Sequence, residues 1–155
     1  MNTKTLVLLV VAVVILIGGY MVFAGSANAP TVGEGAPSGG TFAYINASKD
    51  LIIVDSPKPG ETVGQTFSIS GSARGYWYFE ASFPVEIQDG QGNVIAQTIA
   101  QAEGDWMTEE FVPFKARVEF PAPYYGDVIV VLKKDNPSGE PERDASVMFP
   151  VVIQS

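Results

Sequence analysis

The sequence contains neither cysteine nor histidine. The missing cysteine excludes disulfides, thiolate nucleophiles, zinc-thiolate sites and a lipid attached through an N-terminal Cys, and the missing histidine excludes imidazole bases and the commonest metal ligand. Positive charge is also scarce, since 9 Lys+Arg stand against 17 Asp+Glu and give a net charge of −8. Such a chain is poorly suited to neutralise phosphate, so we expect it to bind neither nucleic acid nor anionic lipid headgroups.

One long apolar run stands out near the N-terminus. Of the 19 residues at positions 6–24, 17 are apolar and none is charged. As a helix rising about 1.5 Å per residue, the run reaches roughly 28 Å, close to the hydrocarbon thickness of a bilayer. It predicts a transmembrane anchor.

A cleaved signal peptide is the alternative reading of this run. Ala27-Asn28-Ala29 has the small-x-small form of a cleavage site, but the apolar run is longer than the usual 7–15 residues and Pro30 follows the candidate site directly. With a retained anchor, Lys4 favours a cytoplasmic stub at residues 1–5. The remainder, with 8 Lys+Arg and 17 Asp+Glu and thus a net charge of −9, then lies outside the cytoplasm at the cell membrane.

Residues 25–48 are dominated by Gly, Ala, Ser and Pro, which is typical of a flexible linker. Phe42, Tyr44 and Ile45 interrupt this composition, and docking of these residues on the folded part as an extra strand is the alternative for the end of the linker. From residue 49 to residue 155, short alternating or continuously apolar runs recur between turn-forming clusters, and no long window has helical periodicity. We expect strands near residues 51–54, 66–72, 76–88, 94–101, 111–120, 128–132 and 146–154. Seven strands at this spacing predict an immunoglobulin-like antiparallel β-sandwich, whose buried aromatics can supply a core without disulfides.

Several segments of this region carry a family resemblance. They are IVDSPKPG at residues 53–60, FSISGSA at 67–73, VEIQD at 85–89 leading into GNV at 92–94, and GDV at 126–128. In this order and spacing they resemble the immunoglobulin-like domain of bacterial spore germination proteins, over roughly residues 51–153. The resemblance implies an extracytoplasmic accessory module of the bacterial cell envelope without known catalytic activity. Such domains also occur in organisms that do not sporulate, so germination itself is not implied.

The remaining residues favour neither catalysis nor metal binding. The carboxylates that a glycan hydrolase needs lie on alternating strands, where they are typical of a solvated face. The loop of residues 135–144 offers Asp135, Asn136, Ser138 and Asp144 as weak calcium-ligand candidates, but their order does not fit an EF-hand. We therefore expect no enzyme, no metal and no cofactor, and keep a calcium-dependent or carboxylate-based hydrolase of envelope glycans as the alternative.

The aromatic run at residues 76–79 suggests a binding surface. If this run is a strand, Trp77 and Phe79 fill the core, while Tyr76 and Tyr78 face outward beside Glu80. Two exposed tyrosines next to a carboxylate could hold an envelope glycan or an extended peptide of an envelope protein. Pro84 further predicts that this strand is an edge or carries a bulge. The membrane, through the N-terminal helix, is the remaining expected partner.

Overall fold

The computed structural model describes residues 40–155. The predicted anchor, the signal-peptide alternative and most of the predicted linker therefore lie outside the described residues. Within the described residues, no helix is long and apolar enough to cross a membrane.

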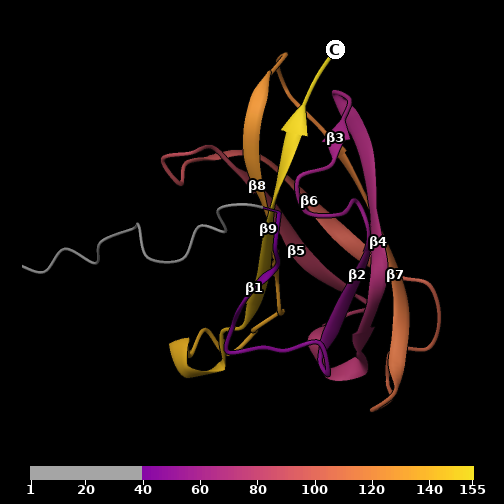
Figure 1. Cartoon of the computed structure of the whole chain (residues 1–155). Coiled ribbons are helices and arrows are strands. Elements are labelled where there is room, and N and C mark those ends of the chain that lie inside the picture. Colours follow the sequence, from indigo (N-terminus) through magenta and orange to yellow (C-terminus); the bar gives the residue numbers. More distant parts are fainter. Residues whose placement is uncertain (1–39) are drawn as a thin grey trace, which may run out of the picture. The chain divides into compact units, whose positions relative to one another are not determined.

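The described chain is all-β and forms strands joined by short connections (Figure 1). The strands are β1 (Ala43–Ile45), β2 (Ile52–Ser56), β3 (Thr62–Val63), β4 (Thr66–Arg74), β5 (Ser82–Gln88), β6 (Val94–Ala102), β7 (Phe111–Glu119), β8 (Gly126–Lys133) and β9 (Ser146–Ile153). Two single-turn 3-10 helices, η1 (Gly75–Trp77) and η2 (Pro141–Arg143), interrupt them.

The strands follow the order β1-β9-β8-β5-β6-β7-β4-β2 in one curled sheet (Figure 1). Neighbours on this path are antiparallel, and the short β3 adds a parallel pairing to β9. The ladder between β6 and β7 contains two residue pairs, Gln101 with Lys115 and Ala102 with Phe114. β6 and β7 form no further ladder pairs beyond this corner, and the single curled sheet encloses an apolar core on its inner face.

The core follows from the alternation along the strands. In β7 and β9 every second residue is buried, as the period of two predicts for strands with one wet face. Phe83 lies at the centre of an aromatic cluster, with ring centroids 5.0 Å from Phe114, 5.2 Å from Tyr78 and 6.4 Å from Trp77. These rings join strands of both halves of the curled sheet, which accounts for a core without disulfides.

The strand expected at residues 76–88 is shorter than predicted. Residues 75–77 form η1, and Phe79 and Ser82 then exchange two backbone hydrogen bonds of 3.0 and 3.1 Å around a tight turn. Regular alternation starts only at Ser82, so the side-chain directions extrapolated back to Tyr78 and Phe79 were wrong. Tyr78 is 4% exposed and Phe79 is 44% exposed, the reverse of the prediction.

The folded unit begins earlier than the predicted boundary at residue 49, as the alternative of an extra strand allowed. β1, which composition places in the linker, pairs antiparallel with β9, and Phe42 packs edge-on against Phe149 with centroids 5.1 Å apart. The folded unit therefore begins before residue 49.

Pro84 predicted a strand that is an edge or carries a bulge. The strand is no edge, since β5 lies between β8 and β6, but its ladder with β6 has a register shift between Ile87 and Gln88. Pro84 itself pairs with Ile99 of β6 but lies beyond the β5–β8 ladder, where its missing N–H leaves no bond unmade.

Candidate functional site

A hollow of about 220 Å³ lies at the end of the sheet that holds the two 3-10 helices. Five segments form its walls: the residue after β1, the residue before β2, η1, the residue after β8, and the stretch from η2 to the start of β9. The lining residues are Asn46, Leu51, Tyr76, Trp77, Lys134, Glu142, Arg143, Asp144 and Ala145. A space of this size is smaller than a typical drug-sized pocket and suits a single sugar ring or one side chain.

Backbone hydrogen bonds hold these segments together. The N–H of Asp135 donates to the carbonyl oxygen of Trp77 at 3.1 Å, and the N–H of Lys134 donates to that of Ala145 at 2.8 Å. The side-chain amide of Asn46 donates to the carbonyl oxygen of Asp144 at 3.0 Å. Asn46 has a φ of 49°, a left-handed conformation that asparagine tolerates better than most residues. The walls are thus fixed by two main-chain hydrogen bonds and one bond from the Asn46 side chain.

The charges around the hollow balance. Lys134 and Arg143 contribute two positive charges, and Glu142 and Asp144 contribute two negative ones. The guanidinium Nε of Arg143 also lies 2.8 Å from a carboxylate oxygen of Glu140. In a chain with a net charge of −8, this is a locally neutral region rich in hydrogen-bond donors and acceptors. It therefore suits a polar ligand of low charge better than a strongly anionic one.

The three predicted binding residues, Tyr76, Tyr78 and Glu80, lie in different environments in the structure. Tyr76 is 50% exposed and lines the hollow. Tyr78 is buried and its hydroxyl donates a 2.7 Å hydrogen bond to the carbonyl oxygen of Val112, so it cannot present its ring to a partner. Glu80 lies in the turn between Phe79 and Ser82 and is not among the residues that line the hollow. The structure therefore brings Tyr76 together with other residues than those predicted.

The loop of residues 135–144 is closed by its own hydrogen bonds. The side-chain amide of Asn136 donates to Asp144 Oδ1 and to the carbonyl oxygen of Glu140, both at 2.8 Å, while its oxygen accepts from Ser138 Oγ at 2.6 Å. These contacts occupy three of the four candidate calcium ligands. Across residues 40–155, no group of three or more acidic side chains could hold a metal ion. The loop instead contributes Asp144 to the hollow that Tyr76 lines.

Trp77, which also lines the hollow, has an unusual polar atom. Its indole Nε1 is buried and has no hydrogen-bond acceptor in the part of the chain that the structure describes. Buried tryptophan N–H groups usually find an acceptor, because an unpaired donor carries the full cost of its desolvation. The sequence did not predict that Trp77 lines this hollow, nor that Asn46, Lys134 and Arg143 do, because only the tertiary fold brings these residues together.

The architecture defines the class of the protein as all-β, with antiparallel strands in one curled, sandwich-like sheet. The family model described as immunoglobulin-like domain of bacterial spore germination matches residues 51–140, which is more than half of the chain. The chain belongs to this family, as the resemblance predicted. Neither the comparison with curated proteins nor that with solved structures gives a match. The matched region ends before η2 and β9, so Asn46 and the residues at 142–145 of the hollow lie outside it.

Proposed function

We propose that this protein is a non-catalytic binding module, held at the outer surface of a bacterial cell membrane, that binds a glycan strand of the cell envelope in the hollow beside Tyr76. Its family supports a module without catalytic activity. The run of 17 apolar residues among the 19 at positions 6–24 supports a retained anchor, and Lys4 supports an outward-facing domain.

The observation that carries glycan binding is the half-exposed Tyr76 ring beside a charge-balanced set of amide, carboxylate and cationic groups. The C–H-rich face of a sugar ring packs against an aromatic face, and its hydroxyl groups exchange hydrogen bonds with side chains such as Asn46 and Arg143. The hollow, at about 220 Å³, accommodates about one ring.

The test is titration of the full chain in detergent micelles with soluble peptidoglycan fragments. A Trp106→Phe variant leaves Trp77 as the single tryptophan, because the chain has two, and its fluorescence then reports on the hollow. We expect saturable binding that Tyr76→Ala weakens about tenfold, which corresponds to about 1.4 kcal/mol. Tyr125→Ala removes another exposed tyrosine, 63% exposed and outside the hollow, and should leave binding unchanged. Equal affinities of the two variants would contradict the proposed site.

Anchoring and orientation need a separate experiment. The absence of cysteine makes a single introduced thiol a clean topological marker. In intact cells, a membrane-impermeant maleimide should label Gln91→Cys in the exposed turn between β5 and β6 and should label Thr3→Cys only after lysis. Release of the Gln91→Cys chain by alkaline carbonate would instead indicate a cleaved signal.

A further inference from the structure

The β6 strand leaves a long stretch of backbone without a partner. β5 pairs with it from Val94 to Gln101, but β7 reaches it only through Gln101 and Ala102. Within residues 40–155, no strand pairs with the other side of residues 94–100. An open edge of this kind is a template on which another strand can be added.

The two terminal strands of the sheet, in contrast, are protected or short. β2 carries Asp55 and a register shift between Val54 and Ser56, and Pro57 follows it directly. β1 is three residues long. β6 is nine residues long, with the sequence VIAQTIAQA, and contains no charge and no proline. Its register shift opposite Ile87 and Gln88 lies at the N-terminal end of the free stretch and not at its centre. Edge strands are usually protected by charge, proline or a central bulge, and β6 has none of these.

We propose that the free edge of β6 pairs antiparallel with β6 of a second copy of this chain, about a two-fold axis at Gln97. The sequence around that residue, Ile-Ala-Gln-Thr-Ile, reads nearly the same in both directions. Across the axis Gln97 faces its own copy, and Ile95 faces Ile99 of the other chain. An isologous interface requires this self-complementarity, which a foreign partner would not need.

The direction of the backbone groups fits the proposed register. The N–H of Ala102 donates toward β5, to Ala81 at 2.8 Å, and the N–H of Glu103 donates toward β7, to Pro113 at 2.7 Å. Because these directions alternate along a strand, the N–H and C=O groups of Gln97 and Ile99 point to the free side. Gln97 and its copy can therefore exchange two hydrogen bonds at the axis.

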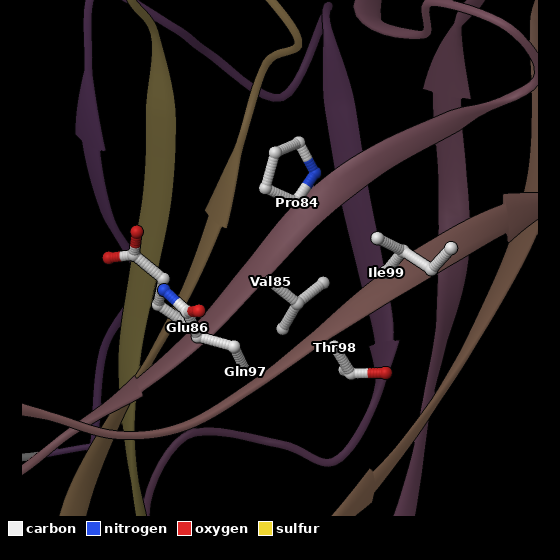
Figure 2. A pocket seen from close by; sticks show the side chains of 6 residues that line it. All are labelled: Pro84, Val85, Glu86, Gln97, Thr98 and Ile99. Atoms are coloured by element: carbon white, nitrogen blue, oxygen red, sulfur yellow. The ribbon is translucent and has the colours of Figure 1, made fainter.

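Charge also favours a second copy. Gln97, Thr98 and the 53% exposed Ile99 of β6 line a shallow hollow together with residues of β5, among which Glu86 is the one charged side chain (Figure 2). Two copies of an acidic chain repel each other, yet this edge adds no charge, and the nearby Glu86 is neutralised by Lys133 at 3.0 Å. Pairing at β6 therefore brings no uncompensated like charges into direct contact.

Cysteine cross-linking of the full chain tests this proposal, because the sequence has no competing thiol. Four variants each carry a single cysteine, at position 95, 97, 99 or 101. Each variant is oxidised, or treated with a short bifunctional thiol reagent, in detergent micelles with empty micelles in excess. Gln97→Cys should form covalent dimers about tenfold faster than the others, since the axis gives its two thiols a high effective concentration. Ile53→Cys, on the exposed face of β2 and 39% exposed, controls for random collisions.

A second measurement does not depend on a covalent bond. Gln97→Lys places two like charges opposite each other at the axis, and sedimentation should show that the dimer is lost. Gln91→Lys adds the same charge in the exposed turn before β6 and should sediment like the unmodified chain. The proposal is overturned if Gln97→Cys cross-links no faster than Ile53→Cys, or if the Gln97→Lys chain remains as dimeric as the Gln91→Lys chain.

Discussion

The hydroxyl of Tyr78 donates a 2.7 Å hydrogen bond to the carbonyl oxygen of Val112, which fastens the segment after η1 to strand β7. The Tyr78 ring lies 5.2 Å from that of Phe83 in the core, centroid to centroid. This side chain therefore fills core space and also satisfies a main-chain acceptor, two requirements that a surface tyrosine does not meet. It holds in place the segment from which Tyr76 projects.

Replacing Tyr78 by phenylalanine should lower the free energy of unfolding by about 1–2 kcal/mol at neutral pH. The ring stays, but the carbonyl oxygen of Val112 loses its donor. Urea unfolding of the two chains measures the difference. Tyr124→Phe removes a hydroxyl whose hydrogen bond to Asp127 is long, at 3.5 Å, and should cost less. Equal losses for the two variants would contradict a special role for Tyr78.

The same bond predicts a dependence on alkaline pH. Burial raises the pKa of the Tyr78 hydroxyl well above its ordinary value of 10.0. The folded state therefore holds this proton more tightly than the unfolded state, so its contribution to stability is complete below pH 10 and declines as the pH rises further. The stability difference between the unmodified chain and Tyr78→Phe should shrink above pH 10. A constant difference up to pH 11 would show that this hydroxyl does not titrate differently in the two states.

Gly75 is predicted to tolerate no side chain. A Cβ at this position would collide with the carbonyl oxygens of Trp106 and Thr108, both of them main-chain atoms that cannot move aside cheaply. Gly75→Ala should therefore cost roughly 3 kcal/mol or more, measured as a lower midpoint in urea. Gly90→Ala is the matched control, because a Cβ there meets nothing within 4 Å and its φ is not positive. The control should change stability by less than about 0.5 kcal/mol.

The sequence predicts regular strands well and irregular connections poorly. Phe114, Ala116 and Val118 of β7 are buried as their alternation predicted, since a period of two persists wherever a strand stays regular. The alternation at Tyr78 and Phe79 failed because η1 and the turn after it reset the parity. Gly75 was the available signal for that break, although the contacts that require a glycine come from residues thirty positions later.

The candidate hollow shows a second limit of sequence reasoning. Tyr76 and Asp144 appeared in two unrelated hypotheses, an aromatic surface and a calcium loop, and the fold brings both to one place. Nothing in either segment predicts this, because the contact depends on how β8 and β9 pair. Pro84 was likewise interpreted as a sign of an edge strand or a bulge, whereas the long open edge belongs to the neighbouring β6 and the register shift lies at Ile87 and Gln88. Local chemistry predicts elements, and their juxtaposition depends on long-range pairing.

The turn at Glu80 and Ala81 should be improvable. Both residues have positive φ, 49° and 62°, between two strand-like residues that exchange backbone hydrogen bonds. Such a two-residue turn favours Asn-Gly, because other residues pay about 1–2 kcal/mol for a left-handed conformation. Glu80→Asn with Ala81→Gly should stabilise the protein by about 1 kcal/mol in urea unfolding, whereas Ala81→Val should destabilise it. The Asn-Gly chain should also bind glycan normally, because neither residue lines the hollow.

Asp89 closes the turn before β6, and its replacement tests how firmly that edge strand is held. One carboxylate oxygen accepts bonds from the main-chain N–H groups of Gln91 and Asn93, and the other accepts from the Asn93 side chain, all at 2.9 Å. These bonds lower the pKa of Asp89 below its ordinary value of 3.8, and the bond from the Asn93 side chain has the largest effect. The ionised form is therefore favoured by folding, and its contribution is present above pH 3.8 and lost as the pH falls through the lower folded-state pKa.

Asp89→Ala should accordingly lower the melting temperature at pH 7, and this difference from the unmodified chain should disappear on acidification. Asp105→Ala is the matched control, because that carboxylate accepts a single main-chain bond, from Met107 at 3.0 Å, and should matter less. Thermal unfolding from pH 7 to pH 2.5 gives both comparisons. A difference that persists at pH 2.5 would mean that Asp89 acts through its shape and not through its charge. Since the turn sets the start of β6, Asp89→Ala should also slow cross-linking through Gln97→Cys, whereas Asp105→Ala should not.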